Sequence, residues 1–269
     1  MVKHGIIVAD PHCGSKVGLT PNPWQITPRR GGFTKRNKWS RVQIDLWQKF
    51  LYILGKLPKL DFVFSLGDLI DGKAKRSGGT ELITADVQEQ CDMAVEVFET
   101  IREYCKKSVK IVGVYGTDYH VSTEGEDWEN EIAYKAGFMK IGAHEWPSVN
   151  GCVFDLKHHI GNSSIPHGRY TAVAREQLWN NLWAEREEQP KSNVLIRAHV
   201  HHYNQIADAD GVAMTMPALQ GMGSRYGSRQ CSGTVDWGLI YFKIDSNGDY
   251  DWFPHIHRIT AQKAQVVEV

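Results

Sequence analysis

The segment GIIVADPHCG at residues 5–14 places two potential metal ligands directly after an apolar run. The run, Gly5–Ala9, has the length and composition of a buried β-strand. Asp10 and His12 follow it two positions apart, and alternate residues of an extended chain point to the same side. The segment therefore predicts a strand that presents a carboxylate and an imidazole together at its carboxyl end.

Similar apolar runs alternate along the chain with longer segments of helical periodicity, a pattern typical of an α/β layered fold. After residue 205, the runs VAMTM, LIYFKI and DYDWF predict antiparallel strands added to parallel ones. Since no linker-like stretch interrupts the pattern, a single domain over residues 1–269 is expected. The other expected strands are 62–65, 109–115, 153–157 and 193–198, and the expected helices are 40–54 with Gly55 as a left-handed stop, 87–105, and 170 to about 185.

Composition excludes several classes of protein. The 31 Lys and Arg residues balance 31 Asp and Glu residues, so no net charge draws the whole chain of 269 residues to duplex nucleic acid or to anionic lipid. The five cysteines form no CxxC pair, which disfavours a disulfide framework and predicts a reducing compartment. No run approaches the roughly 18 apolar residues of a membrane helix, so a cytoplasmic protein without membrane contact is expected.

Metal-binding residue types recur just after the predicted strands. Ligands of open α/β sheets bind outside the carboxyl ends of strands, so distant segments can converge there on one site. Carboxylates and imidazoles together select divalent first-row ions. Four segments besides the first carry such residues: FSLGDLIDGK with Asp68 and Asp71, GVYGTDYH with Thr117, Asp118 and His120, FDLKHHIG with His158 and His159, and LIRAHVHHY with His199, His201 and His202.

In order, the blocks DPH, GDLIDG, GTDYH, KHHIG and AHVHH resemble the signature of the calcineurin-like metallophosphoesterases. The usual blocks of that family are DxH, GDxxDG, GNHD or GNHE, a single His, and GHxH, and the resemblance spans roughly residues 8–202. It implies a four-layer fold, in which two mixed β-sheets pack as a sandwich flanked by helices. It also implies hydrolysis of a phosphoester by direct attack of a metal-bridging hydroxide, without a covalent enzyme intermediate.

The same resemblance implies two divalent ions, with manganese favoured and iron, zinc, nickel or magnesium as alternatives. Adjacent residues of a strand point to opposite faces, so only one of His158 and His159 can reach an ion, and we favour His158. Asp71 is expected to hold its turn rather than to bind metal. Carried over by position, the first ion would be held by Asp10, His12 and His201, the second by the His158–His159 block and His199, and both by Asp68.

The block at residues 116–120 departs from the family pattern because the usual asparagine ligand is missing. One interpretation is that the Thr117 oxygen or the Asp118 carboxylate replaces it, while His120 protonates or stabilises the leaving oxygen. The other is that His120 is itself the ligand and the acid is absent. We favour the first, with Asp118 and His120 as candidate catalytic residues.

Residues 29–41, RRGGFTKRNKWSR, hold six basic residues, no acid and two aromatic residues. This stretch follows the first strand, so it is expected beside the metals, where Arg36, Lys73 and Arg76 would contact phosphate. It favours a phosphodiester substrate, a nucleotide or a single-stranded nucleic acid. The alternatives are a phosphomonoester, a non-catalytic binding module that keeps the fold, or a different binuclear hydrolase such as an amidohydrolase, which relies on HxH at its first strand. The oligomeric state is not predicted.

Overall fold

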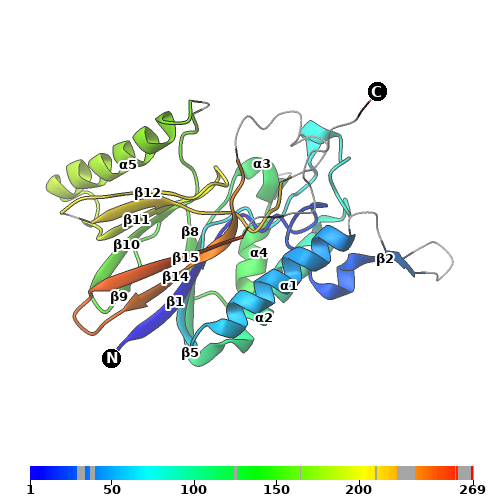
Figure 1. The fold of residues 1–269 in the computed structure, drawn as a ribbon, viewed down its shortest axis with the longest axis horizontal. Helices are drawn as coiled ribbons and strands as arrows, with labels where there is room; N and C mark the ends of the chain where they lie inside the picture. The colour runs from blue at the N-terminus through cyan, green and yellow to red at the C-terminus, as the bar shows by residue number, and fades with distance from the viewer. Residues whose placement is uncertain are drawn as a thin grey trace.

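Two β-sheets face each other in the computed structural model of the protein, with helices on their outer sides (Figure 1). The structure describes residues 1–28, 34–36, 40–123, 126–163, 165–209, 211–222, 234–257, 259 and 268. The first sheet contains β1 (Lys3–Val8), β4 (Leu60–Ser65), β5 (Cys105–Val114), β8 (Lys140–Gly142), β14 (Trp237–Ile244) and β15 (Tyr250–His257). The second contains β9 (Ser148–Val149), β10 (Cys152–Lys157), β11 (Val194–Arg197), β12 (Asn204–Ala207) and β13 (Val212–Thr215).

The remaining elements are helices and short strand pairs. The helices are α1 (Ser40–Lys56), α2 (Val87–Glu103), α3 (Asp118–Val121), α4 (Trp128–Lys135) and α5 (Gly168–Glu185), with the 3-10 turns η1 (Asn22–Gln25) and η2 (Lys75–Ser77). The strand pairs are β2 (Ile26–Pro28) with β3 (Thr34–Arg36), and β6 (Ser122–Thr123) with β7 (Glu126–Asp127).

Both large sheets are mixed. In the first, β1, β4, β5 and β8 run parallel, and β14 pairs antiparallel with both β1 and β15. In the second, β10, β11 and β13 run parallel, while β9 and β12 pair antiparallel at the two edges. The predicted α/β class with two mixed sheets is confirmed.

The strand β1 shows how period-two alternation divides the core. Ile7 points between the sheets, where it joins a buried cluster with Phe64 and Phe154. Ile6 points the other way, into a second cluster that includes the helical residue Phe50. The central strands are thus apolar on both faces because one face meets the opposite sheet and the other meets helices.

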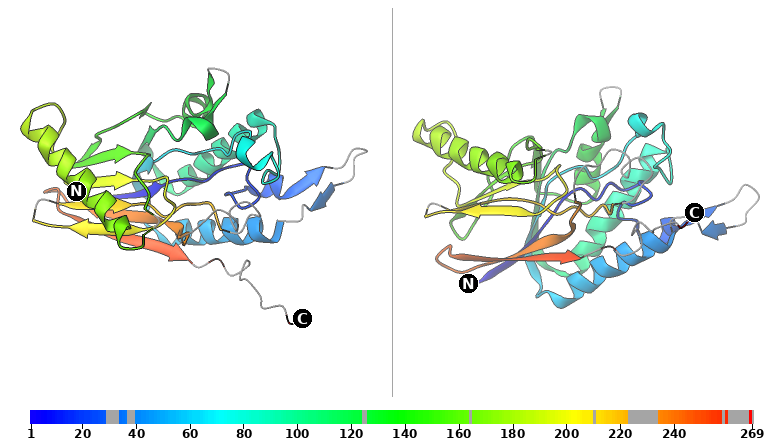
Figure 2. Two further views of the ribbon diagram at one scale, coloured as in Figure 1. Left: turned by 90° about the horizontal axis from the view of Figure 1, so that it is seen from above. Right: turned by 45° about the horizontal axis from the view of Figure 1, so that its top comes forward.

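Helices cover the outer face of each sheet, which gives four layers (Figure 2). The inner faces of α1 and α2 pack on the first sheet through residues such as Phe50 and Phe98. On the second sheet, Val173 of α5 packs against Leu195 and Ala213. Among the described residues, no helix combines the length and the apolar composition needed to cross a membrane.

Two local predictions were wrong, and a third was incomplete. Gly55 was expected to adopt a left-handed stop, but its φ is not positive and α1 continues to Lys56. Cys105 was expected on the α2 helix, yet it begins β5, because the helix closes with a hydrogen bond from the Tyr104 N–H to the Ile101 carbonyl. The residues of β13 were expected to form an antiparallel strand; they do pair antiparallel with β12, but they also pair parallel with β11.

Candidate metal centre

The carboxyl ends of five strands meet at one edge of the sandwich: β1, β4 and β5 of the first sheet, and the parallel neighbours β10 and β11 of the second. Strands β1, β4 and β5 are parallel neighbours, so their carboxyl ends share an edge. From the facing sheet, the His158 ring at the end of β10 hydrogen-bonds through Nδ1 to the Leu66 carbonyl at the end of β4. The convergence predicted for these segments is therefore present in the fold.

Backbone hydrogen bonds join the loop after β1 to the loop after β4. The Asp10 N–H donates to the Gly67 carbonyl at 3.1 Å, and the His12 N–H donates to the Asp68 carbonyl at 3.1 Å. Bonds of this kind fix main-chain positions, so the side chains of the two loops are held at a constant spacing.

Left-handed backbone conformations mark the candidate ligands. The pleat of a strand was expected to direct Asp10 and His12 to the same side, but β1 ends at Val8 and both residues lie in the loop beyond it. A residue with a side chain adopts a positive φ at a cost of about 1–3 kcal/mol, and such strain persists where the surrounding structure enforces it. Eight described residues other than glycine have a positive φ, and five of them are candidate ligands: Asp10 (51°), His12 (42°), Asp68 (51°), His199 (70°) and His201 (53°).

Asp10, His12 and His201 form the first group of three side chains that can share an ion. The Asp10 carboxylate is fully buried, and His201 Nε2 lies 3.2 Å from Asp10 Oδ1. Both Asp10 carboxylate oxygens and His12 Nε2 are buried without a hydrogen-bond partner in the described structure. An unpartnered buried acceptor is costly, so these atoms point to a cation as their natural partner.

Asp68, His158 and His199 form the second group. The Thr117 hydroxyl joins them: its Oγ1 lies 3.2 Å from His158 Nε2, 3.2 Å from His199 Nδ1 and 3.4 Å from Asp68 Oδ2. The Thr117 N–H also donates to Asp68 Oδ1 at 2.5 Å. A threonine hydroxyl thus lies among the ligand atoms of the second group.

Asp68 lies between the two groups. Its Oδ2 is 3.7 Å from His12 Nε2 in the first group and 3.2 Å from His158 Nε2 in the second. Ligands bound about 2.0–2.2 Å from a shared ion lie about 3–4 Å from one another. The spacing therefore fits one carboxylate that serves two neighbouring ions.

Charge coupling shifts the pKa values in the second group. Burial opposes ionisation of Asp68, but His158 and His12 hold its pKa well below the usual range. Burial likewise opposes the charged form of His158, yet the Asp68 carboxylate raises its pKa to about 10. Burial and the neighbouring His158 lower the pKa of His199 to about 4, which keeps this imidazole neutral and able to bind a cation.

Asp71 and His120 contact the ring of His12, whose Nε2 is the nitrogen nearest Asp10 and Asp68. Asp71 Oδ1 is 3.0 Å from His12 Nδ1, so the carboxylate fixes this ring with Nε2 toward Asp10 and Asp68. The His120 ring lies 4.7 Å from the His12 ring, and its Nδ1 hydrogen-bonds to the Asp71 carbonyl at 3.1 Å. Burial and the neighbouring His12 lower the pKa of His120.

The other predicted site residues are not members of the ligand groups described above. His159 is exposed, although its ring is 4.7 Å from the His199 ring, and Asp118 is exposed at the start of α3. Lys73 is exposed and follows Gly72. The side chains of Arg36 and Arg76, and most of the basic stretch 29–41, lie outside the part of the chain that the structure describes.

Two supporting carboxylates were not identified as site residues from the sequence. Asp71 was expected only to hold its turn, although its place in GDLIDG, three residues after Asp68, was a usable signal. Glu129 is fully buried on α4, where its carboxylate accepts hydrogen bonds from backbone N–H groups next to Asp68 and Thr117. Burial raises the pKa of Glu129 to about 8, and the N–H of Gly116 opposes this shift. No sequence signal links Glu129 to Leu69, which lies 60 residues earlier, or to Gly116, which lies 13 residues earlier.

The donor set fits divalent ions. It contains only carboxylate, imidazole and hydroxyl groups, which suit manganese, iron or zinc. The Cys13 thiol is excluded from it, because its Sγ donates to the Leu19 carbonyl and burial raises its pKa. The described residues contain a third group with metal-ligand spacing, His12, Asp71 and His120, which shares His12 with the first group, and none of the three groups includes a soft sulfur ligand.

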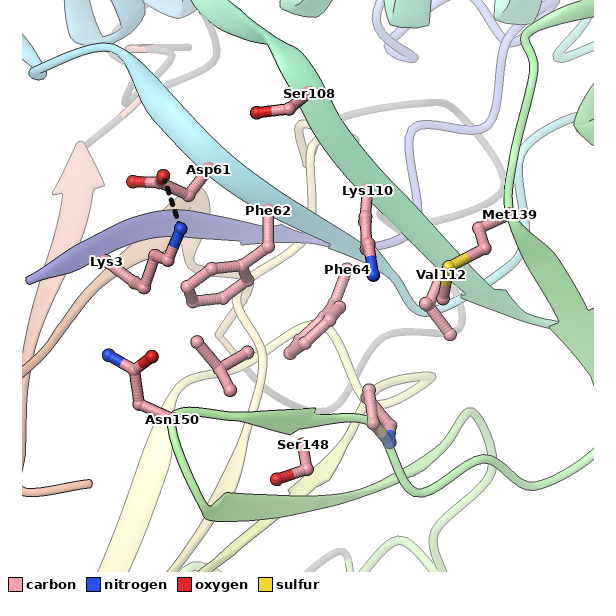
Figure 3. A pocket seen from close by; sticks show the side chains of 12 residues that line it. Lys3, Asp61, Phe62, Phe64, Ser108, Lys110, Val112, Met139, Ser148 and Asn150 are labelled. Carbon is pink, nitrogen blue, oxygen red and sulfur yellow. Dashed lines mark hydrogen bonds and ion pairs between the residues drawn. The ribbon is translucent and has the colours of Figure 1, made fainter. Parts of the chain in front are cut away.

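A cavity of about 210 Å³ lies elsewhere, at the amino ends of β1, β4 and β5. Figure 3 shows the rings of Phe62 and Phe64 facing it and Lys3 paired with Asp61 at its rim. Its lining contains none of the candidate ligands, so we place the chemistry at the opposite edge of the sheets.

No family model matches the sequence, and no curated protein matches it. Among solved structures, it aligns with Vacuolar Protein Sorting 29 from Cryptosporidium parvum at 11% identity over 95% of this chain and 98% of that chain, with a TM-score of 0.46. A novel archaeal phosphodiesterase aligns at 10% identity over 93% and 99%, with a TM-score of 0.44. Zinc-complexed wild-type Vps29 from Entamoeba histolytica aligns at 12% identity over 94% and 98%, with a TM-score of 0.40.

These three neighbours share 10–12% identity with this chain. Their TM-scores lie below 0.5, so neither the activity of one nor the zinc of another carries over to this chain. The function is therefore argued from the residues of the site.

Proposed function

We propose that the protein is a binuclear metal-dependent phosphoesterase that hydrolyses phosphodiesters. The observation that carries this proposal is a pair of adjoining ligand groups that meet at Asp68, with three buried polar atoms that make no hydrogen bond within the described residues. A structural cluster of buried charges would instead satisfy its own atoms. The unpartnered atoms belong to Asp10 and His12 of the first group, and His12 Nε2 lies 3.7 Å from Asp68 Oδ2.

The proposed ligand sets follow the two groups. His158 is chosen over His159 because His158 is buried and lies 3.2 Å from Asp68, whereas His159 is exposed. Manganese is the proposed metal, since the donors are oxygen and imidazole nitrogen. Asp10, His12 and His201 would hold the first ion, His158 and His199 the second, and Asp68 both.

Thr117 would supply the oxygen ligand that replaces the asparagine of the related family. Its hydroxyl lies within 3.4 Å of all three side chains of the second group. Asp118 is exposed one residue later, so it is the weaker candidate for this role. A neutral hydroxyl is a poorer donor than a carboxylate, and the second site is therefore expected to be the weaker of the two.

When bound, two divalent ions neutralise phosphate charge and lower the pKa of a water that attacks phosphorus. Asp71 holds His12 Nδ1, which keeps His12 Nε2 turned toward the ligand cluster. His120 Nδ1 donates a hydrogen bond to the Asp71 carbonyl, so Nε2 is the nitrogen that can donate a proton to a leaving oxygen. A lowered pKa makes the protonated ring a stronger acid.

The preference for a phosphodiester, as a nucleotide or a single-stranded nucleic acid, rests on sequence. It depends on the basic and aromatic stretch 29–41 and on Lys73 and Arg76 after the second ligand block. Lys73 is the one of these whose exposed position supports contact with a phosphate near the site.

Hydrolysis of chromogenic phosphate esters tests the proposal. Purified protein is loaded with Mn²⁺ and assayed with a nitrophenyl phosphodiester and the matching monoester, before and after chelation. We expect turnover that is faster on the diester, is lost on chelation and returns with Mn²⁺. Turnover of the monoester alone would correct the substrate class. No metal-dependent turnover of either ester would instead indicate a binding module that retains the fold.

A further inference from the structure

Three loops build the metal centre, and they are not joined in the same way. These are residues 10–13 after β1, 67–72 after β4 and 116–120 after β5. Backbone hydrogen bonds join the first loop to the second, including one from the Cys13 N–H to the Leu69 carbonyl. Within the described residues, no backbone-to-backbone hydrogen bond joins the second loop to the third. Side chains join these two loops instead: the His120 ring bonds to the Asp71 carbonyl, the Thr117 N–H donates to Asp68 Oδ1, and one side chain from outside both loops contacts the main chain of each.

Glu129 is that outside side chain. Its Oε1 accepts a hydrogen bond from the Leu69 N–H at 2.9 Å, and its Oε2 accepts one from the Gly116 N–H at 2.6 Å. Leu69 follows Asp68 directly, and Gly116 directly precedes Thr117. One side chain thus holds the main chain beside a proposed ligand in each of the two loops.

Glycines let these loops approach closely enough for a single carboxylate to span them. A Cβ atom on Gly116 would lie 2.2 Å from the Asp68 nitrogen, and a Cβ atom on Gly67 would lie 2.4 Å from the Gly116 nitrogen. The two loops therefore touch through their backbones. Both N–H groups need acceptors away from solvent, and a carboxylate has two oxygens while accepting only.

The carboxylate is itself held in place. Glu129 is fully buried in the first turn of α4, and its own N–H donates to the Asp127 side chain that caps this helix at 3.0 Å. A fully buried side chain with both oxygens engaged has little freedom to change rotamer. Glu129 thus supports, from outside the ligand groups, a spacing that the hydrogen bond from the Thr117 N–H to Asp68 Oδ1 also holds from within.

We propose that Glu129 is a positioning residue that helps to set the distance between Asp68 and Thr117 and thereby the affinity of the second metal site. This inference rests on the proposed function. Glutamine at this position would direct an amide NH₂ at one of the two backbone N–H groups, which would push the loops apart. Outer partners of metal ligands typically change metal affinity about 10- to 100-fold, so an effect of that size is expected.

Titration of the metal-free protein with Co²⁺, followed by visible absorption, tests this role. In E129Q, the second Co²⁺ is expected to bind about 10- to 100-fold more weakly, with the first unchanged. The matched control is E131Q, on the same helix, where Glu131 bonds to Lys135 and Gln88 away from the loops. Melting temperatures of both variants separate a loss of fold from a loss of spacing.

A shorter acid provides a second variant if E129Q does not fold. E129D keeps the carboxyl group but cannot reach both loops, so weaker binding of the second Co²⁺ is again expected. Wild-type affinity for both ions in a folded E129Q or E129D protein would overturn the role of Glu129 and leave the proposed function standing. A wild-type protein that takes up no Co²⁺ would overturn the proposed function, and this role with it.

Discussion

Two buried carboxylates in this protein have opposite surroundings. Asp155, 1% exposed on β10, has both oxygens satisfied: Oδ1 lies 2.6 Å from Arg197 Nη1 and 2.7 Å from His144 Nε2, and Oδ2 accepts from Asn180 at 3.0 Å. Asp10, with no exposed surface, makes no hydrogen bond of good geometry through either oxygen within the described structure, and its Oδ1 has the His201 imidazole beside it, with Nε2 at 3.2 Å. Burial and charge are common to both, so the difference in hydrogen-bond satisfaction separates a structural cluster from a ligand cluster.

The contrast extends to the backbone. Asp155 lies within a regular strand, whereas Asp10 and Asp68 have φ values of 51° in loops beyond strand ends. The Asp155 cluster, consisting of Asp155, Arg197, His144 and Asn180, neutralises itself and holds the pKa of Asp155 at about 2 against the effect of burial. The metal-site cluster keeps strained residues and open acceptor atoms, which a stability role alone would not require.

The largest expected effect comes from Asp68→Asn. One carboxylate faces both ligand groups, so the substitution should remove metal from both sites and lower phosphodiester hydrolysis on the order of 10³-fold or more. Metal content by mass spectrometry and the rate on a chromogenic diester measure this together. Full activity in a variant with normal metal content would mean that the site is misplaced.

Asp155→Asn should have the opposite profile. Loss of the carboxylate leaves Arg197 Nη1 and His144 Nε2 without a carboxylate acceptor, although Glu176 still pairs with Arg197 Nε, so the free energy of unfolding should fall by about 1–3 kcal/mol. Metal content of the folded fraction should not change. Urea denaturation measures the free energy of unfolding, and metal analysis of the folded fraction measures the metal content. Metal loss without destabilisation would show that the Asp155 cluster does not have a purely structural role.

His120→Ala sharpens the comparison inside the metal site. If His120 protonates the leaving oxygen, the rate should fall about 10²- to 10⁴-fold while both ions remain bound. Single-turnover rates and metal stoichiometry of the same preparation provide the measurement. Loss of one ion would instead identify His120 as a ligand.

Thr117→Val should give the smallest of the four effects. Valine keeps the shape of threonine but lacks the hydroxyl among the second ligand group, so one ion should bind at least about tenfold more weakly. Thr117→Asn restores an oxygen donor and should retain that ion. Isothermal titration with Mn²⁺ compares the two variants, and equal affinities in T117V and wild type would remove Thr117 from the ligand set.

Much of the fold could be predicted because its signals are local. The apolar runs at 5–9, 62–65, 153–157 and 193–198 correspond to central strands, since buried parallel strands are apolar on both faces. The end of α1 at Gly55 was predicted wrongly, and the pairing of β13 was predicted only in part. Both depend on tertiary context, namely how the last helical turn closes and which neighbours flank a strand.

The candidate ligands could be predicted because aspartate and histidine recur directly after the apolar runs that form strands. Asp10, His12, Asp68, His158, His199 and His201 lie together in the groups that the sequence blocks implied. Asp10 and His12 were expected to point to one side because alternate residues of a strand do so. They lie instead in a loop with positive φ, and the alternation of apolar and polar residues along the sequence does not reveal this conformation. The role of Glu129 could not be predicted, because its contacts depend on a helix docking against two distant loops.

Metal stoichiometry of the wild-type protein tests the central claim most directly. The protein would be stripped with chelator, loaded with Mn²⁺, passed through gel filtration and analysed by mass spectrometry. Two adjoining ligand groups that share Asp68 predict two Mn²⁺ ions per chain, with the second leaving first on dilution. A folded protein that retains no Mn²⁺, or that retains it equally after Asp10→Ala and Asp68→Ala, would contradict the account.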